Sequence, residues 1–220
     1  IAAGTRTTTV SQLEGDFSFD GSTLAFDGLR VEAPELALQL DGRVELLAAA
    51  PRVDTRYEGR LRLGPFVPWV APEEAVSGEV AFSGTVEGAL DAPNVALAVA
   101  AQDLAWRDQR GMSLALQVAL SSSEAAIEQL RLTVGGGTVE GRGRVGLTDD
   151  ATSHVEVTWT GLDLGGLAVT AGITEPRIAT VATGRASADW AGTDVAAATA
   201  AIDTSLSTGR APAAAVALSG

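Results

Sequence analysis

The sequence predicts an all-β protein: a long antiparallel meander that curls into an elongated groove with an apolar concave face and little helix. Three observations predict this fold. Large apolar residues alternate with small or polar ones over many short stretches. Turn-forming segments recur every ~8 to 12 residues between these stretches. No alternation of strand and helix patterns, which would indicate a parallel nucleotide-binding sheet, is visible.

The expected strands follow from the alternation of period two. Small or neutral residues such as Ala37, Gln39 and Gln117 lie between large aliphatic ones. Successive residues of a strand point to opposite faces, so the large residues share one face. The residues that we expect to line the groove are Leu36, Leu38, Leu40, Val95, Leu97, Val99, Leu114, Leu116, Val118, Leu130, Leu132, Val155 and Val157.

The expected turns are short and contain residues that tolerate positive φ. They are Asp20-Gly21, Asp27-Gly28, Ala33 to Glu35, Asp41-Gly42, Asp91 to Asn94 and Gly135 to Gly137. If ~16 strands follow one another at ~4.8 Å per strand, the sheet is roughly 75 Å wide. Twist curls a sheet of that width, and its apolar face ends up inside the curl.

Three stretches depart from the strand pattern. The prolines between Gly64 and Val76, and the glycines between Leu164 and Pro176, predict a short helical turn or a loop in each segment. The Ala-rich segment from Asp194 to Leu206 fits a helix by propensity and a poor strand by its Val, Thr and Ile residues. Both interpretations of that segment stay open.

An internal repeat divides the chain. The segment from Leu24 to Leu46 aligns without a gap on the segment from Ala125 to Leu147, and Arg30 falls on Arg131, 101 residues later. We therefore expect a first β repeat unit at 13–118 and a second at 119–220, forming one continuous groove within a longer chain.

The composition disfavours several functions. The net charge is −13 and lysine is absent, which disfavours binding to nucleic acid and docking on anionic membrane surfaces. There is no cysteine and only one histidine, so disulfides, thiolate metal sites and histidine-based triads cannot be assembled in the usual ways.

The segment from Val76 to Leu147 resembles the repeated units of the TamB and AsmA-like family. Its pieces are a Gly-x-x-x-x-Pro turn at Gly88 to Pro93, a strand ending in Asp103-Leu104, a strand start at Gly111 to Leu114, and a glycine-rich close at Leu130 to Leu147. With the second copy, the resemblance covers about three quarters of the chain.

The resemblance implies a β-taco, a long β groove that crosses the periplasm of a Gram-negative bacterium and is anchored in the inner membrane by a segment outside this chain. It implies a non-enzymatic conduit that moves phospholipid between the inner and outer membranes, with acyl chains as partners and no cofactor or metal. An outer-membrane barrel protein is a further expected partner, through parts of the protein outside this chain.

Two alternatives stay open. One is a structural module, either a solenoid rod or a scaffold that assists outer-membrane protein assembly, including that of autotransporters, by pairing its open edge with a client strand. Solenoid rods usually carry polar ladders, whereas Asn94 is the only asparagine here, which favours the groove. The other alternative, an enzyme, has the least support.

Smaller motifs have structural interpretations. The Gly-x-Gly-x-x-Gly motif at Gly141 to Gly146 precedes a turn instead of a helix, so it predicts a bent or bulged strand and not a dinucleotide site. His154 is expected to be exposed on a strand, and Asp149-Asp150 to be a solvated turn.

The bulky and basic residues allow two interpretations each. Tryptophans either line the lipid channel or pack at strand ends, and arginines either meet lipid phosphates at the groove mouth or keep an exposed strand face soluble. The residues concerned are Trp69, Trp106, Trp159, Trp190, Arg60, Arg62, Arg142 and Arg144.

Overall fold

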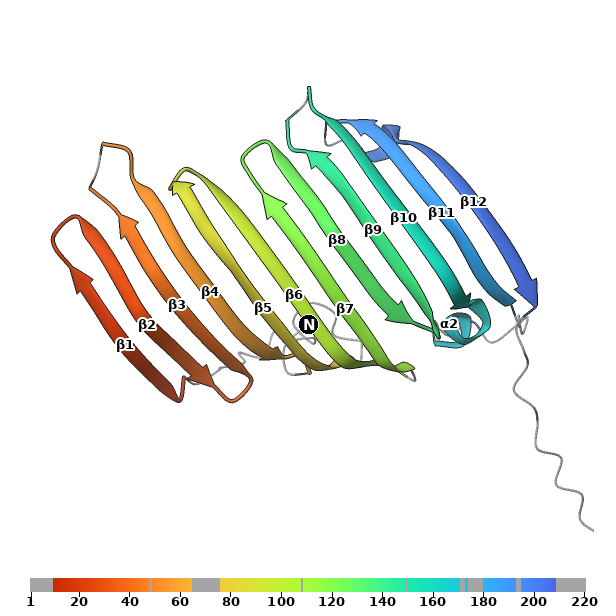
Figure 1. The fold of residues 1–220 in the computed structure, drawn as a ribbon, viewed down its shortest axis with the longest axis horizontal. Helices are drawn as coiled ribbons and strands as arrows, with labels where there is room; N and C mark the ends of the chain where they lie inside the picture. Colours follow the sequence, from red (N-terminus) through yellow and green to blue (C-terminus); the bar gives the residue numbers. More distant parts are fainter. Residues whose placement is uncertain are drawn as a thin grey trace, which may run out of the picture.

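A computed structural model describes residues 10–47, 49–64, 76–107, 109–148, 150–170, 173, 180–192 and 195–208. In these residues, twelve strands form one antiparallel sheet in which each strand pairs with its neighbours in sequence, from β1 to β12 (Figure 1). The sheet is not closed into a barrel. The predicted all-β antiparallel meander is therefore confirmed.

The strands are long, most of them having ten residues or more. Their bounds are β1 Gln12–Phe19, β2 Thr23–Ala33, β3 Leu36–Glu45, β4 Arg52–Arg62, β5 Val76–Ala89, β6 Ala92–Trp106, β7 Gln109–Leu120, β8 Glu124–Val134, β9 Gly137–Gly146, β10 Thr152–Asp163, β11 Thr180–Ala191 and β12 Thr199–Thr208.

Two of the predicted turns are wrong, which explains in part why the described residues contain fewer strands than expected. Asp27-Gly28 is a bulge inside β2, where the pairing register with β3 shifts between Phe26 and Leu29. Gly28 has a φ of 60° there, and its N–H donates to the carboxylate of Asp41 at 2.7 Å. Asp-Gly can thus bend a strand without reversing it.

Asp41-Gly42, the other wrongly predicted turn, lies within β3 and pairs regularly with β4. A β-carbon on Gly42 would collide with the backbone carbonyl of Asp54 on β4. Glycine is therefore needed at this position for the close approach of two backbones. Turns do occur at the other predicted places, with Pro34-Glu35 and Gly135-Gly136 as two examples.

The stretches that depart from the strand pattern are partly described. Leu164–Thr170 forms α2, so of the two expected alternatives, a short helical turn or a loop, the helical turn holds for that part. Residues 171–172 and 174–176 lie outside the described residues. Residues 65–75 also lie outside them. In the Ala-rich segment, Val195–Ala197 is a single 3-10 turn and strand β12 follows, so the strand interpretation holds for most of it.

The internal repeat recurs in the element boundaries. β2 starts at Thr23 and β8 at Glu124, and β3 starts at Leu36 and β9 at Gly137, so both pairs of strands are 101 residues apart. The bulge recurs as well, because the register of β8 against β9 shifts between Ile127 and Leu130, again 101 residues after the bulge in β2. The two hairpins share one backbone plan.

The core is small because the described strands form a single layer. The main contacts between elements are those between neighbouring strands. A cluster of Ala101, Leu104 and Met112 on β6 and β7 is buried, and Val80 and Trp106 pack against it. Most other large apolar side chains are only half-buried, which leaves one face of the sheet available for contact.

Candidate functional site: an apolar sheet face

The pairing register assigns each strand residue to a face. Residues directly opposite in an antiparallel pair share a face, and neighbours along a strand alternate. One row of opposed residues crosses all twelve strands and contains no polar side chain. This central row is Leu13, Val31, Leu38, Gly59, Phe82, Val99, Leu116, Leu130, Gly141, Val157, Ala186 and Ile202.

Three more rows lie on the same side, and together the four rows are named the apolar face. The added residues are Ala33, Leu36, Leu61, Val80, Ala101, Leu114, Leu132, Val139, Trp159, Gly184 and Thr204; Leu29, Leu40, Tyr57, Gly84, Leu97, Val118, Ile127, Gly143, Val155, Ala188 and Ala200; and Phe17, Phe26, Gly42, Thr55, Val86, Val95, Leu120, Ala125 and Val145. None of them carries a charge. At ~4.8 Å per strand, twelve strands make this face about 50 Å long.

All thirteen residues expected to line a groove lie on the apolar face. Sequence reasoning missed Tyr57 and Phe82, which also lie there. In β4, Tyr57 lies between the charged residues Arg56 and Glu58, and in β5, Phe82 lies between Ala81 and Ser83, so neither ring belongs to a run of large aliphatic residues. The signal that could have found Tyr57 is the period-two spacing of the charges around it.

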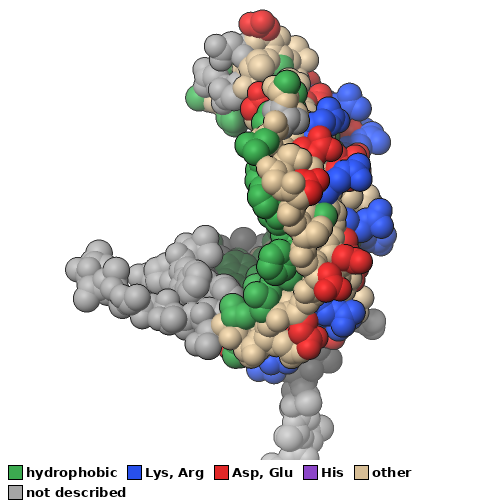
Figure 2. Space-filling model, turned by 90° about the vertical axis from the view of Figure 1, so that its left-hand side faces the viewer, with side chains coloured by type: hydrophobic (Ala, Val, Ile, Leu, Met, Phe, Trp, Pro, Cys, Tyr) green, Lys and Arg blue, Asp and Glu red, His purple; other side chains and the backbone are tan. Residues whose placement is uncertain are grey.

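The opposite side, named the charged face, carries the ionisable side chains of the same strands. One of its rows contains Gln12, Glu32, Ala37, Arg60, Ala81, Ala100, Ala115, Arg131, Glu140, Thr158, Arg185 and Asp203. Figure 2 shows hydrophobic side chains along the inwardly curved left-hand side of the molecule and charged side chains along the right-hand side. The two faces therefore differ sharply in chemistry.

Cross-strand ion pairs order the charged face. Residues directly opposite one another pair at 3.1 Å between Arg43 and Asp54 and at 2.8 Å between Arg142 and Glu156. The Arg142 guanidinium holds the pKa of Glu156 below its ordinary value. Such exposed pairs contribute little to stability, so their main effect is on strand register and solubility.

His154 is exposed on the charged face, as predicted. Its Nδ1 lies 2.6 Å from a carboxylate oxygen of Asp189 on β11, and its Nε2 lies 3.5 Å from Glu156. The hydrogen bond to Asp189 is the main reason why the pKa of His154 is raised. Within the described residues, no group of three His, Asp or Glu side chains is arranged to hold a metal ion.

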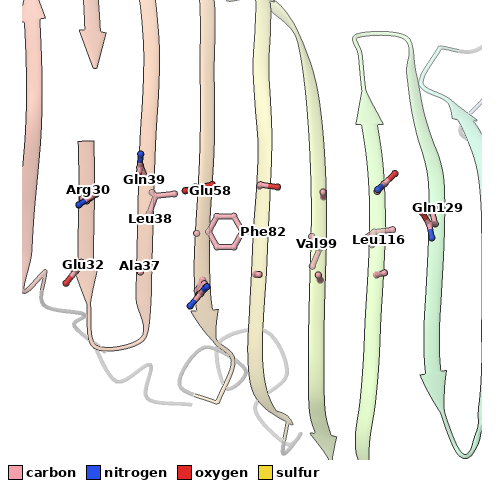
Figure 3. A pocket seen from close by; sticks show the side chains of 18 residues that line it. Arg30, Glu32, Ala37, Leu38, Gln39, Glu58, Phe82, Val99, Leu116 and Gln129 are labelled. Atoms are coloured by element: carbon pink, nitrogen blue, oxygen red, sulfur yellow. The ribbon is translucent and has the colours of Figure 1, made fainter. Parts of the chain in front are cut away.

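A depression of about 690 Å³ lies on the charged face and not on the apolar one (Figure 3). Thirteen of its eighteen lining residues belong to the charged face, and its floor is made of alanines such as Ala81, Ala98 and Ala115. The other five, including Leu38 and Phe82, belong to the central row and point to the other side. Two arginines and two glutamates on its border balance in charge, so the depression favours no single ligand class.

The tryptophans and arginines separate by face. Trp159 lies on the apolar face and Trp106 packs at the buried cluster, whereas Trp69 lies outside the described residues. Trp190 is opposite the buried Ser153, and its indole N–H has no acceptor among the described residues. All four arginines that could have met lipid phosphates lie on the charged face, away from the apolar rows: Arg60, Arg62, Arg142 and Arg144.

The remaining motifs fit a structural role. Gly141 to Gly146 lies within β9, so the strand interpretation is confirmed. Its pairing with β10 shows no register shift as far as Arg144, whereas its pairing with β8 has the bulge between Ile127 and Leu130, opposite Gly143 and Gly141. Asp150 is exposed, and Asp149 lies outside the described residues. None of the helices among the described residues has the length and hydrophobicity that crossing a bilayer requires.

Comparisons of this chain with protein-family models, with curated proteins and with solved structures found no match.

Proposed function

We propose that this chain is a segment of a non-enzymatic lipid-transfer conduit of the TamB and AsmA-like kind, in which phospholipid acyl chains lie along the apolar face. The proposed setting is the periplasm of a Gram-negative bacterium, between an inner-membrane anchor and the outer membrane. Both the anchor and any contact with an outer-membrane barrel would belong to segments outside this chain.

The central row is the observation that carries the proposal. It crosses twelve strands without a polar side chain, while the charged face of the same strands holds ion pairs. Soluble proteins rarely leave an apolar patch of this length in contact with water, because its exposure costs free energy. Because this surface runs without interruption from strand to strand and is only half-buried, it fits a long flexible hydrocarbon chain better than a compact ligand.

The physical basis of binding is burial of methylenes, at about 0.8 kcal/mol for each CH₂ that leaves water. The contacts are non-directional and repeat at each strand, so a chain can slide along the row without meeting a single deep minimum. Headgroups stay in water at the open side of the curve. The described residues contain no group that would supply energy, so the direction of transport has to come from elsewhere.

Photo-crosslinking tests the proposal. Crosslinkers at Leu38, Leu97, Leu116 and Val157 should capture phospholipid, because their side chains lie on the apolar face. The matched controls are Gln39, Gln117 and Glu156, neighbours on the same strands that point to the charged face. Capture of equal strength from both sets would contradict a one-sided lipid surface.

A second candidate is a scaffold that pairs an edge strand with a client strand. Within the described residues, β1 and β12 each pair on one side only, and they expose Phe17 and Ile202, each 73% accessible. Such edges accept an added strand. The scaffold predicts crosslinking to protein from Phe17 and Ile202, with little lipid captured at Leu116.

A further inference from the structure

Two aromatic side chains near the middle of the apolar face lie on glycines of the neighbouring strand. In the central row, Phe82 of β5 is opposite Gly59 of β4, and a β-carbon on Gly59 would be 2.5 Å from Cζ of Phe82. In the next row the order is reversed: Tyr57 of β4 is opposite Gly84 of β5, and a β-carbon there would be 2.5 Å from the tyrosine hydroxyl.

Both rings therefore lie along the sheet and do not stand off it. Figure 3 shows the ring of Phe82 nearly face-on between the ribbons of β4 and β5. The hydroxyl of Tyr57 passes over β5 and donates a hydrogen bond to the carbonyl of Ala96 on β6 at 3.1 Å. The two ring centroids are 6.4 Å apart, so the rings cover adjacent parts of the apolar face.

The restraint on these rings is weak. A single hydrogen bond between uncharged groups holds Tyr57, and contact with bare backbone holds Phe82. Both residues are half-buried instead of enclosed, and a change of χ1 swings an aromatic ring from the sheet surface into the space above it. An upright ring would occupy the volume that hydrocarbon needs over β4, β5 and β6.

We propose that Tyr57 and Phe82 control passage along the groove: lying on Gly84 and Gly59 they leave it open, and either ring standing upright obstructs it. This inference rests on the proposed lipid conduit and adds the point at which its traffic is regulated. Gly59 and Gly84 make the open state possible, because without a β-carbon they leave room for the rings to lie against the sheet.

The test uses a photo-crosslinker at Val99, beside Phe82 in the central row, and a second one at Val157, five strands from Phe82. In Gly59→Ala the added methyl displaces the Phe82 ring, and capture of phospholipid from mixed phosphatidylethanolamine and phosphatidylglycerol vesicles at Val99 should fall about tenfold, as expected when about two methylenes lose their contacts. Capture at Val157 should stay at the wild-type level.

The double variant Gly59→Ala with Phe82→Ala separates ring displacement from backbone distortion, because the β-carbon would also lie 2.6 Å from the carbonyl of Ala37. Restored capture at Val99 in the double variant supports the passage control, whereas capture as low as in Gly59→Ala overturns it. Gly141→Ala adds the same methyl in the same row, 3.3 Å from a Leu130 methyl, with no ring to displace, so any fall in its capture at Val157 measures the effect of the methyl alone, and the fall at Val99 in Gly59→Ala should be larger.

Tyr57→Phe keeps the inference testable if circular dichroism shows that Gly59→Ala does not fold. Loss of the hydrogen bond to Ala96 releases the ring, so capture at Leu97 should fall, and Tyr57→Ala should restore it. Unchanged capture in Tyr57→Phe would overturn the role of this bond. If the wild-type chain captures no lipid at Val99 or Val157, the conduit itself fails, and that outcome differs from the failure of passage control alone.

Discussion

The hairpins β2–β3 and β8–β9 have the same backbone plan but cover the apolar face differently. Their strands begin 101 residues apart and carry the bulge at the same place. On the apolar face, β3 presents Leu36, Leu38 and Leu40, whereas β9 presents Gly137, Val139 and Gly141 at the corresponding positions. The side chains that a strand presents on the apolar face are named its floor. The floor of β3 is made of leucines, whereas that of β9 is largely glycine and leaves much of the backbone bare.

The difference shows that pairing and floor are set by separate features of the sequence. Turn residues and the alternation of faces fix the register, and these are shared by both hairpins. The height of the floor depends on the side chains of the apolar face alone. At β9, neighbouring side chains fill part of the gap: a β-carbon on Gly143 would lie 2.8 Å from a methyl of Val155. A repeat can therefore vary the groove without changing the sheet.

The largest expected effect is that of a charge on either floor. Leu40→Asp should abolish lipid capture at Leu38, and Gly141→Asp should do the same at Val157, because an unpaired carboxylate against hydrocarbon costs several kcal/mol, more than an uncharged polar group does. The control is Gln39→Asp, whose side chain points to the charged face. Phospholipid capture is measured by crosslinking, with folding checked by circular dichroism. Wild-type capture in both floor variants would mean that lipid does not use these rows.

Exchanging the floors should have the next largest effect. Leu36→Gly with Leu40→Gly gives β3 the floor of β9 and should lower the free energy of unfolding by about 2–4 kcal/mol, through lost apolar burial and added backbone entropy. The reverse change, Gly141→Leu, should alter stability by less than about 1 kcal/mol, since its β-carbon would be 3.3 Å from a Leu130 methyl and in ordinary van der Waals contact, at 3.5 Å, with the backbone carbonyl of Glu156. Gly141→Leu should also reduce the capture of phospholipid at Val157, because the larger side chain narrows the groove.

Urea unfolding followed by circular dichroism measures both changes. A double-glycine variant as stable as the wild type would show that the leucines of β3 contribute no burial. A large loss of stability in Gly141→Leu would show that β9 needs its glycine for backbone packing, as β3 needs Gly42.

Much of this architecture is predictable from sequence because alternation and turn residues act locally. The thirteen large aliphatics share a face since each lies at an even spacing within its strand. The positions of Asp27-Gly28 and Asp41-Gly42 were not predictable in the same way. Positive φ at a glycine suits a bulge, a close backbone approach or a turn equally well, and the neighbouring strand decides between them.

The placement of Tyr57 and Phe82 against glycines of the neighbouring strand is another feature that could not be predicted from the sequence. Tyr57 and Gly84 are 27 residues apart, and Phe82 and Gly59 are 23 residues apart, so their pairing depends on the register of β4 against β5. The segment between those strands lies mostly outside the described residues. Without a short turn to count from, the sequence does not define that register.

A smaller effect should distinguish the two bulges. Gly28→Val forces a β-branched residue into a φ of 60°, which costs about 1–2 kcal/mol. The corresponding residue of the second bulge, Gln129, does not have positive φ, so Gln129→Val should change stability by less than about 0.5 kcal/mol. Thermal unfolding of the two variants in one buffer makes the comparison. Equal losses would mean that the two bulges share one backbone conformation after all.

The smallest expected effect is a pH dependence confined to the second half of the sheet. On β4, Asp54 pairs with Arg43 of the preceding strand, whereas on β10, His154 is opposite Arg144 of the preceding strand and hydrogen-bonds to Asp189 of the following one.

The pKa of His154 is raised in the folded chain by the hydrogen bond to Asp189, so its contribution to stability is fully present below the unfolded value of 6.5 and is lost as pH rises through the higher folded value. His154→Gln should therefore reduce stability more at about pH 6 than at about pH 8. Asp54→Asn, which removes the ion pair with Arg43 on the first half of the sheet, is the control variant without a change at a histidine. The measurement is urea unfolding of the three proteins at both pH values and at one salt concentration. The His154 side chain is about half exposed, so the difference is small and should shrink further when salt is added. A His154→Gln loss that is the same at both pH values would show that Asp189 holds the imidazole by packing and not by its charge.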